Sequence, residues 1–153
     1  MRAGRFFIPF FVCIFSIVLF AQTSPFQIDV PAAPLSLAPG EVQTIPVTIA
    51  IPKGYFVYAE KTELNFLNPQ GLKIQNITYP SSHTRLDPFF KKPMEVFEGE
   101  AVIEVAFQAP TDALPGRKTL EALLNLQGCS DVLCHPEETR LLAFHFDIGS
   151  SGG

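Results

Sequence analysis

The residues best suited to chemistry are two cysteines, Cys129 and Cys134, which enclose the four-residue spacer SDVL. Two nearby thiols can form a structural disulfide, exchange a disulfide with another protein, or help to bind a metal ion. The spacer is longer than that of the Cys-x-x-Cys redox motif. Together with the adjacent His135 the cysteines supply at most three metal ligands, whereas zinc sites favour four. A metal site is therefore the least favoured of the three interpretations.

The segments on either side of the pair have the pattern of strands. Residues 118–127 and 139–148 carry apolar side chains at every second position, which is typical of strands with one buried face. The first segment also contains helix-forming residues, but its alternation and the following Gly128 favour a strand. If the two strands pair antiparallel, Cys129 and Cys134 lie nearly opposite each other, with Cα atoms ~4.5–5.5 Å apart. A disulfide fits this separation, because its Cα atoms lie ~4.4–6.8 Å apart.

A disulfide at this place would contribute little to stability. In the chain-entropy model, a disulfide that closes a loop of about six residues stabilises the fold by roughly 2 kcal/mol, whereas one that closes a loop of about a hundred residues stabilises it by roughly 5 kcal/mol. The flanking strands already close the same loop, and a domain of about 130 residues can build a core without covalent links. These arguments favour a redox-active disulfide over a structural one, but the spacing alone leaves both interpretations open.

Acidic residues surround the cysteines in the sequence. Asp131 lies in the spacer, and Glu137 and Glu138 follow it. Negative charge near a thiol raises its pKa, and no helix N-terminus that would lower the pKa is predicted nearby. Such thiols would react slowly with arbitrary disulfides, which suits a protein that reacts only with a docked partner. His135 could adjust the thiolate fraction through its protonation, but we expect it to be a loop residue that faces water.

The rest of the chain predicts one all-β domain over residues 26–148. Alternating segments recur between turns, and fourteen prolines separate them, which is typical of an antiparallel sandwich. Residues 149–153, GSSGG, are expected to form a flexible tail or linker. The expected strands are residues 26–30, 41–51, 55–60, 72–79, 101–109, 118–127 and 139–148.

One segment, residues 81–100, does not alternate and mixes polar with aromatic residues. We expect a long loop that carries Phe89 and Phe90. Loops of this length in compact domains are often functional. The alternative is that both rings pack on the core.

The start of the chain has the pattern of a secretory signal. Arg2 and Arg5 precede an apolar run over residues 6–21, which predicts a cleaved signal peptide over residues 1–21; the alternative is an uncleaved anchor. The predicted mature chain keeps two cysteines, with nine basic against fifteen acidic residues and a net charge of −6. This charge argues against binding to nucleic acids or anionic lipids. Export places the cysteines where disulfides form.

Three segments resemble the family of N-terminal periplasmic domains of the thiol:disulfide interchange protein DsbD. LQGC at residues 126–129 and CHPEET at 134–139 resemble its active-site hairpin. IPKGYFVYAEKTEL at 51–64 resembles its tyrosine-rich segment, and LDPFFKKPMEVFEGE at 86–100 resembles its cap loop. The segments occur in the family's order, and the similarity spans about residues 26–148. The resemblance implies an immunoglobulin-like antiparallel β-sandwich.

The resemblance also implies a function. Cys129 and Cys134 would take electrons from a thioredoxin-like donor and pass them through mixed disulfides to periplasmic thioredoxin-fold partners. Disulfide isomerases and cytochrome c maturation thioredoxins are such partners. Cys134 would form the mixed disulfide. The protein would then be a periplasmic protein-disulfide reductase component, and we expect neither a metal nor another cofactor.

Further site residues follow from their positions in the matching segments. Phe89 would be the cap aromatic that shields the cysteine pair, with Phe90 beside it and Asp87 as the cap-loop acid. The other residues expected next to the site are Tyr55, Tyr58, Asp131, His135 and Glu137.

The sequence departs from the family pattern in four ways. The cysteine spacer is one residue shorter, Pro88 replaces an acidic cap-loop residue, and the run KKP at residues 91–93 replaces a glycine. The 153 residues themselves predict neither the membrane domain nor the thioredoxin-like domain that the family pattern has downstream. The chain is therefore expected to be a fragment or a free-standing version, and its electron donor stays open. Membrane contact would come only from a missing downstream domain or an uncleaved signal.

A competing hypothesis needs no redox chemistry. It is a secreted, non-enzymatic β-sandwich that binds a ligand and uses the hairpin disulfide for structure alone.

Overall fold

The computed structural model describes residues 23–149 of the 153-residue chain. The predicted signal peptide, residues 1–21, and residues 150–153 of the predicted tail lie outside the described residues. Within residues 23–149, no helix is long and apolar enough to cross a membrane. The strands are β1 (Gln27–Asp29), β2 (Leu35–Leu37), β3 (Val42–Ala50), β4 (Tyr55–Tyr58), β5 (Glu63–Asn68), β6 (Lys73–Thr78), β7 (His83–Leu86), β8 (Pro93–Phe97), β9 (Glu100–Gln108), β10 (Gly116–Leu126), β11 (Gly128–Ser130) and β12 (Glu138–Ile148), with one 3₁₀ turn, η1 (Ala59–Lys61).

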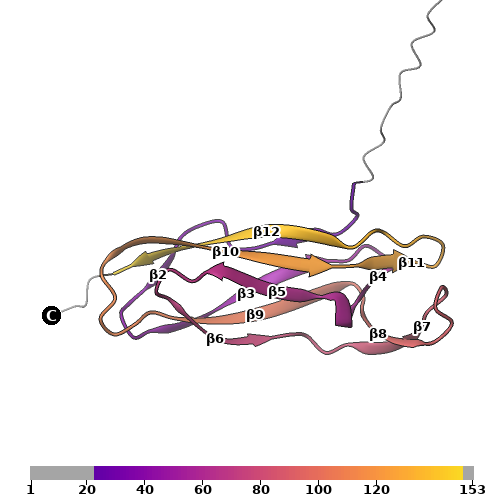
Figure 1. The fold of residues 1–153 in the computed structure, drawn as a ribbon, viewed down its shortest axis with the longest axis horizontal. Helices are drawn as coiled ribbons and strands as arrows, with labels where there is room; N and C mark the ends of the chain where they lie inside the picture. The colour runs from indigo at the N-terminus through magenta and orange to yellow at the C-terminus, as the bar shows by residue number, and fades with distance from the viewer. Residues whose placement is uncertain (1–22, 150–153) are drawn as a thin grey trace, which may run out of the picture.

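Two four-stranded sheets pack face to face and form a sandwich (Figure 1). One sheet has the strand order β1-β3-β9-β6 and the other β2-β12-β10-β5. Because side chains alternate across a strand, three or four alternate residues of each long strand are buried between the sheets. Phe107 of β9 meets Phe144 and Phe146 of β12 across this core, at ring-centroid separations of 5.4 and 5.0 Å.

A third sheet, with the order β11-β4-β8-β7, extends the sandwich at one end, on the right in Figure 1. β10 passes into β11 through Gln127 alone, and β4 is joined to β5 through η1. The N–H of Tyr58 also donates to the carbonyl oxygen of Gln127 at 3.0 Å. The rigid sandwich therefore fixes the position of β11 and β4, the two strands on which the cysteine site is built.

The structure confirms the all-β sandwich and each of the seven predicted strands, whose ends differ from the prediction by two residues at most. One of the strand pairs, β2 with β12, is parallel rather than antiparallel. The prediction of a long loop over residues 81–100 is wrong in part, because β7 and β8 form a hairpin there. The sequence did not reveal β7, HTRL, because this strand has no apolar alternation. The short strands β2 and β11, as well as β5, were not among the predicted strands.

Candidate redox site at the cysteine pair

Cys129 and Cys134 form a disulfide, and their Cα atoms lie 4.0 Å apart. They pair as an isolated antiparallel bridge, so they lie opposite each other as predicted, slightly closer than the expected range. Ser130 closes the spacer between them. Its backbone N–H donates to the carbonyl oxygen of Leu133 at 2.7 Å, and its Oγ accepts the N–H groups of Val132 and Leu133 at 3.3 and 3.1 Å. The spacer is therefore a hydrogen-bonded turn.

The two cysteines differ in their exposure to solvent. Cys129 is 0% exposed, and on β11 it is the register partner of Phe56 on β4. Cys134 is partly exposed. A thiol or disulfide in solution therefore has better access to Cys134 than to Cys129.

A small hydrophobic cluster, separate from the main core, lies under the disulfide. Its members are Phe56, Tyr58, Met94, Val96 and Cys129, and Cys134 packs against it. Phe56 and Tyr58 are two residues apart on β4, so their rings share one face of the sheet and meet at a centroid separation of 5.5 Å. The two sulfurs therefore pack against apolar side chains of the third sheet.

Gly128 allows β11 to approach its neighbours closely. A Cβ atom at this position would lie 2.2 Å from Cζ of Phe26 and 2.8 Å from the carbonyl oxygen of Phe56. The ring of His135 also packs on Phe26 and on Tyr55, at centroid separations of 5.9 and 5.8 Å. Its Nε2 is buried and has no hydrogen-bond partner. The prediction that His135 faces water is therefore wrong for the ring nitrogen Nε2, because the half-buried ring packs against these two aromatic side chains.

The hydroxyl group of Tyr58 lies against both sulfurs. Its oxygen is 3.3 Å from Sγ of Cys129 and 4.0 Å from Sγ of Cys134. A disulfide sulfur carries no proton, and the Tyr58 O–H donates instead to Oδ2 of Asp87 at 2.5 Å. Burial, together with the hydrogen bond to Asp87 and its negative charge, raises the pKa of Tyr58. The hydroxyl group therefore keeps its proton at neutral pH.

Asp87 organises the turn between β7 and β8, residues 87–92, which we call the cap turn. Its Oδ1 accepts the backbone N–H groups of Phe89 and Phe90 at 2.8 and 2.7 Å. Asp87 is 1% exposed, and burial would raise its pKa. The hydrogen bonds from Tyr58 and the two backbone N–H groups outweigh burial and hold the pKa of this carboxyl group below its ordinary value. A charged carboxylate therefore holds the cap turn beside the sulfurs.

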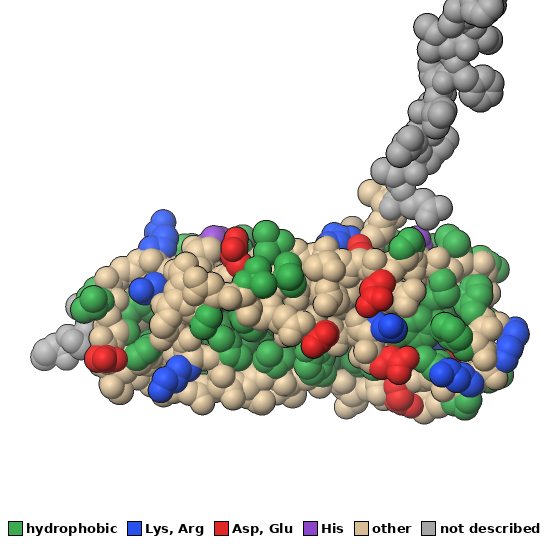
Figure 2. All heavy atoms as spheres, in the orientation of Figure 1, with side chains coloured by type: hydrophobic (Ala, Val, Ile, Leu, Met, Phe, Trp, Pro, Cys, Tyr) green, Lys and Arg blue, Asp and Glu red, His purple; other side chains and the backbone are tan. Residues whose placement is uncertain are grey.

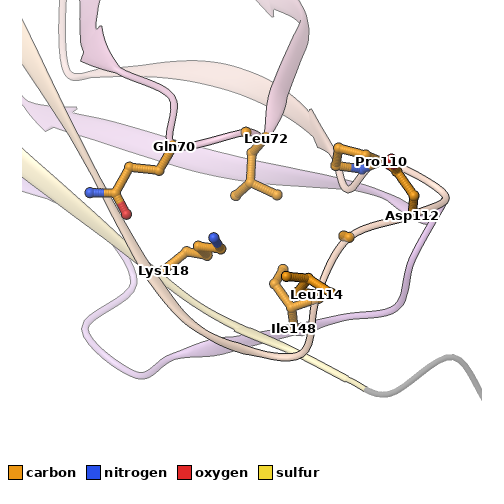
Figure 3. A pocket seen from close by; sticks show the side chains of 9 residues that line it. Gln70, Leu72, Pro110, Asp112, Leu114, Lys118 and Ile148 are labelled. Atoms are coloured by element: carbon orange, nitrogen blue, oxygen red, sulfur yellow. The ribbon is translucent and has the colours of Figure 1, made fainter.

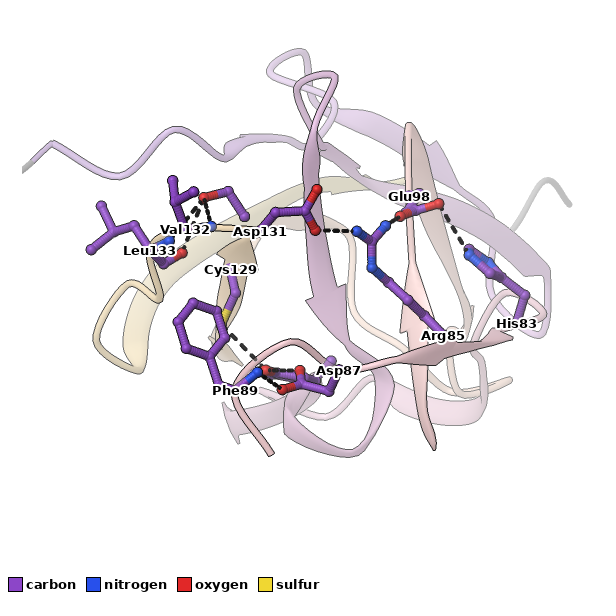
Figure 4. Close-up of polar contacts among 11 residues, drawn as sticks. His83, Arg85, Asp87, Phe89, Glu98, Cys129, Asp131, Val132 and Leu133 are labelled. Atoms are coloured by element: carbon purple, nitrogen blue, oxygen red, sulfur yellow. Dashed lines mark hydrogen bonds and ion pairs between the residues drawn. The ribbon is translucent and has the colours of Figure 1, made fainter. Parts of the chain in front are cut away.

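The two phenylalanines predicted as the cap lie on this turn. Phe89 is 44% exposed and Phe90 is 62% exposed, so neither ring packs in the core. The Phe90 ring meets Tyr58 at a centroid separation of 6.3 Å. Figure 4 shows the Phe89 ring on the side of the cap turn that faces Cys129. The structure thus brings the predicted cap residues to the predicted site.

Each of the acidic residues that flank the cysteines has a basic partner. The pairs are Asp131 with Arg85 at 2.5 Å, Glu137 with Lys61 at 3.9 Å, and Glu138 with Arg140 at 2.9 Å. These cations offset the negative charge that the sequence placed around the thiols. The carboxylate in the hydrogen-bond network of the sulfurs is that of Asp87.

Sequence reasoning missed Arg85 as a site residue. It lies on β7, and its Cζ sits 4.6 Å from the ring centroid of Phe56. The sequence carried no signal for it, because β7 has no apolar alternation and Asp87 lies in the turn that follows this strand. Nothing in the sequence indicated its pairing with Asp131, 46 residues away.

Exposed apolar side chains surround this end of the molecule. Leu86 ends β7, and Val132 and Leu133 form the tip of the cysteine spacer. With Phe89 and Phe90 they make a set that we call the apolar rim. Figure 2 shows apolar side chains at the surface of this end, on the right, among charged ones. Single exposed apolar residues are ordinary, but a group of them around one reactive pair indicates a surface for another protein.

A pocket of about 200 Å³ lies at the other end of the sandwich (Figure 3). Its lining residues are Gln70, Gly71, Leu72, Pro110, Asp112, Ala113, Leu114, Lys118 and Ile148. It contains no cysteine. Within the part of the chain that the structure describes, no three His, Cys, Asp or Glu residues are grouped as metal ligands.

A family model described as thiol:disulfide interchange protein DsbD, N-terminal, matches residues 24–145. The N-terminal domain of DsbD from Neisseria meningitidis, in its reduced form, has a similar structure, with a TM-score of 0.55 and 20% identity over 80% of this chain and 86% of that one. The same domain in complex with the PilB N-terminal domain gives a TM-score of 0.53 and 20% identity, over 80% and 87%. Among curated proteins, no sequence matches the chain.

The similar structures show the fold of this chain, and the family model shows its family. The two Neisseria structures confirm the predicted immunoglobulin-like sandwich. The family model covers most of the chain, including the disulfide between Cys129 and Cys134. The chain therefore belongs to the family of DsbD N-terminal domains, which are domains of thiol:disulfide interchange proteins.

Proposed function

We propose that this protein is a periplasmic protein-disulfide reductase component that relays electrons through Cys129 and Cys134. A thioredoxin-like protein would be the donor, and thioredoxin-fold proteins, such as disulfide isomerases and cytochrome c maturation thioredoxins, would be the acceptors. The observation that carries the proposal is the unequal burial of the two cysteines beside an apolar rim. The complex of the Neisseria DsbD domain with the PilB N-terminal domain supports a protein partner. The predicted signal peptide supports export.

The proposed reaction is a pair of thiol–disulfide exchanges. The Cys134 thiolate of the reduced protein attacks a partner disulfide, an S–S bond forms between the proteins, and the other partner sulfur leaves as a thiolate that takes up a proton. The Cys129 thiolate then attacks Cys134. The Cys129–Cys134 disulfide forms, and the partner leaves with two thiols and two more electrons. The thioredoxin-like donor returns two electrons to the pair by the reverse steps.

The reduction potential of the Cys129–Cys134 pair tests this proposal. We expect a value above about −300 mV, within the range of thioredoxin-like proteins, because structural disulfides of secreted proteins lie below that value. Equilibration with a thiol–disulfide redox buffer, followed by quantification of the two redox forms, gives the potential. A lower value would favour the competing binding module with a structural disulfide, and the relay would fail.

We further propose that Phe89 and Phe90 shield the disulfide from small reagents. An aromatic contact such as that of Phe90 with Tyr58 contributes about 1 kcal/mol. We therefore expect Phe90→Ala to speed reduction of the disulfide by dithiothreitol about fivefold. Phe89→Ala should change the rate in the same direction, because its ring lies on the side of the cap turn that faces Cys129. Stopped-flow or quenched-flow measurements of the rate constant check this expectation.

Leu86→Ala provides the control for the cap variants. Leu86 lies on the same hairpin and is exposed, like the cap phenylalanines, but it contributes no ring. Leu86→Ala should therefore leave the rate constant for reduction by dithiothreitol unchanged. If all three variants react like the wild type, the cap turn does not shield the sulfurs.

A further inference from the structure

A single arginine side chain spans the sheet that carries the site. Arg85 lies on β7 and Asp131 directly follows β11, and these strands are the opposite edges of the sheet β11-β4-β8-β7. Nevertheless Nη2 of Arg85 lies 2.5 Å from Oδ1 of Asp131. The side chain therefore joins the two edges of the sheet across the strands that lie between them.

This connection runs over the same face of the sheet as the disulfide. Cζ of Arg85 lies 4.6 Å from the ring centroid of Phe56, which is the antiparallel partner of Cys129. The side chains of such partners share one face of a sheet. The other terminal nitrogen of Arg85 pairs with Glu98, so one guanidinium group bridges two carboxylates (Figure 4).

We propose that Arg85 is a positioning residue that ties the cysteine spacer to the β7–β8 hairpin and so holds the cap turn against the disulfide. Asp131 lies within the spacer, and Arg85 precedes Asp87, the residue that holds the cap turn, by two positions. Arg85 packs on Phe56 and Asp87 accepts a hydrogen bond from Tyr58, and these two rings share one face of β4. Movement of the hairpin away from the spacer must therefore break the contact between Arg85 and Asp131. The inference rests on the proposed function only for the shielding role of the cap turn.

Arg85 differs from an ordinary surface ion pair, which contributes little. Its planar guanidinium group pairs with two carboxylates at once, and the ring of Phe56 covers one of its faces. Arg117 and Asp147 form a pair of the ordinary kind on β10 and β12, with a single contact of 3.0 Å between largely exposed side chains. Arg117→Gln removes the same charge as Arg85→Gln and is therefore a matched control.

The experiment measures how fast dithiothreitol reduces the oxidised protein, in a Cys13→Ser background. Dithiothreitol attacks the disulfide and then closes to its cyclic disulfide, so two electrons pass to the cysteine pair and two thiols remain. We expect Arg85→Gln and Asp131→Asn each to raise the rate constant about fivefold, and Arg85→Lys, which can pair with one carboxylate, about twofold. Arg117→Gln should match the wild type.

Three measurements separate the contact between Arg85 and Asp131, which we call the tether, from other effects. Dithiothreitol reacts as an anion, so electrostatic steering alone would make Arg85→Gln slower and Asp131→Asn faster, whereas the tether predicts that both are faster. The double variant of Arg85 and Asp131 should react no faster than either single variant, because both changes break one contact. Salt, raised from about 0.02 M to about 0.5 M, should accelerate the wild type and Arg117→Gln more than Arg85→Gln.

An Arg85→Gln protein that is folded by circular dichroism and reacts at the wild-type rate, or more slowly, would overturn the proposal. Additive effects in the double variant would overturn it as well. The proposed function is tested separately, by electron exchange between the wild-type protein and a thioredoxin-fold partner. Failure of that exchange leaves the dithiothreitol result intact. Phe89→Ala and Phe90→Ala test the shielding itself, so a contact that does not hold the cap turn is distinguishable from a cap turn that does not shield.

Discussion

Cys129→Ser is expected to trap a thioredoxin-fold partner as a covalent complex, whereas Cys134→Ser is expected to trap very little. The first variant keeps the partly exposed Cys134 and lacks the thiol that would resolve the mixed disulfide. The Cys134→Ser variant keeps only Cys129, which is fully buried against Phe56 and Tyr58. We expect a difference of at least about tenfold in trapped complex, because access of the thiol controls such reactions. Non-reducing electrophoresis and mass spectrometry of the linked peptides measure it.

Both variants should also lose catalytic exchange, because two sulfurs are needed to pass two electrons. A Cys13→Ser background removes the third thiol of the chain. The double Cys129→Ser/Cys134→Ser variant is the control and should trap nothing. Equal trapping by the two single variants would contradict the assignment of Cys134 as the attacking residue. Trapping by neither would remove the mechanism of the relay.

The sequence predicted the parts of the fold that bury one face of a long strand. β10 and β12 each carry buried apolar side chains at four alternate positions, so their pairing and the opposed cysteines at their end could be expected from the sequence. The third sheet gave a weaker signal. Residues 55–58 of β4, YFVY, are almost entirely apolar, and β7 has three polar residues out of four. Strands of three to five residues show too few periods for a pattern to emerge.

Charge and hydrogen-bond partners were the least predictable features of the site. The sequence shows that Asp131, Glu137 and Glu138 lie near the cysteines along the chain, but not that each faces a cation from another segment. It likewise could not show that Phe26, which lies more than a hundred positions earlier, encloses the ring of His135. These contacts join distant residues, and their geometry depends on the finished fold rather than on local spacing.

Asp87→Ala is expected to lower the free energy of unfolding by about 3 kcal/mol. The carboxylate accepts hydrogen bonds from the Tyr58 hydroxyl and from the N–H groups of Phe89 and Phe90. Its removal leaves the buried Tyr58 hydroxyl without an acceptor and frees the cap turn, and a buried donor left unpaired costs about 1–3 kcal/mol. Urea denaturation at neutral pH measures the loss. Asp87→Asn, which keeps an acceptor for the backbone N–H groups, should lose about half as much.

Asp112→Ala is the control, because Asp112 is exposed at the other end of the sandwich and should change the stability by less than about 0.5 kcal/mol. Asp87→Asn should in addition speed reduction of the disulfide by dithiothreitol, because the same carboxylate holds both the cap turn and the Tyr58 hydroxyl against the sulfurs. A variant that loses stability but not shielding would separate the fold of the cap turn from its proposed role.

The lowered pKa of Asp87 also makes the stability difference depend on pH. A carboxyl group whose pKa is lower in the folded state binds fewer protons there than in the unfolded state. Its contribution to the free energy of unfolding is therefore complete above the unfolded pKa of about 4 and is lost as the pH falls through the folded pKa. The unfolding free energies of the wild type and Asp87→Asn should therefore run parallel above about pH 5 and converge as the pH falls below the unfolded pKa of about 4. Curves that stay parallel throughout would mean that Asp87 is not the charged acceptor that holds Tyr58 and the cap turn. Convergence would assign the acid-sensitive part of the stability to the carboxylate that positions the cap over the disulfide.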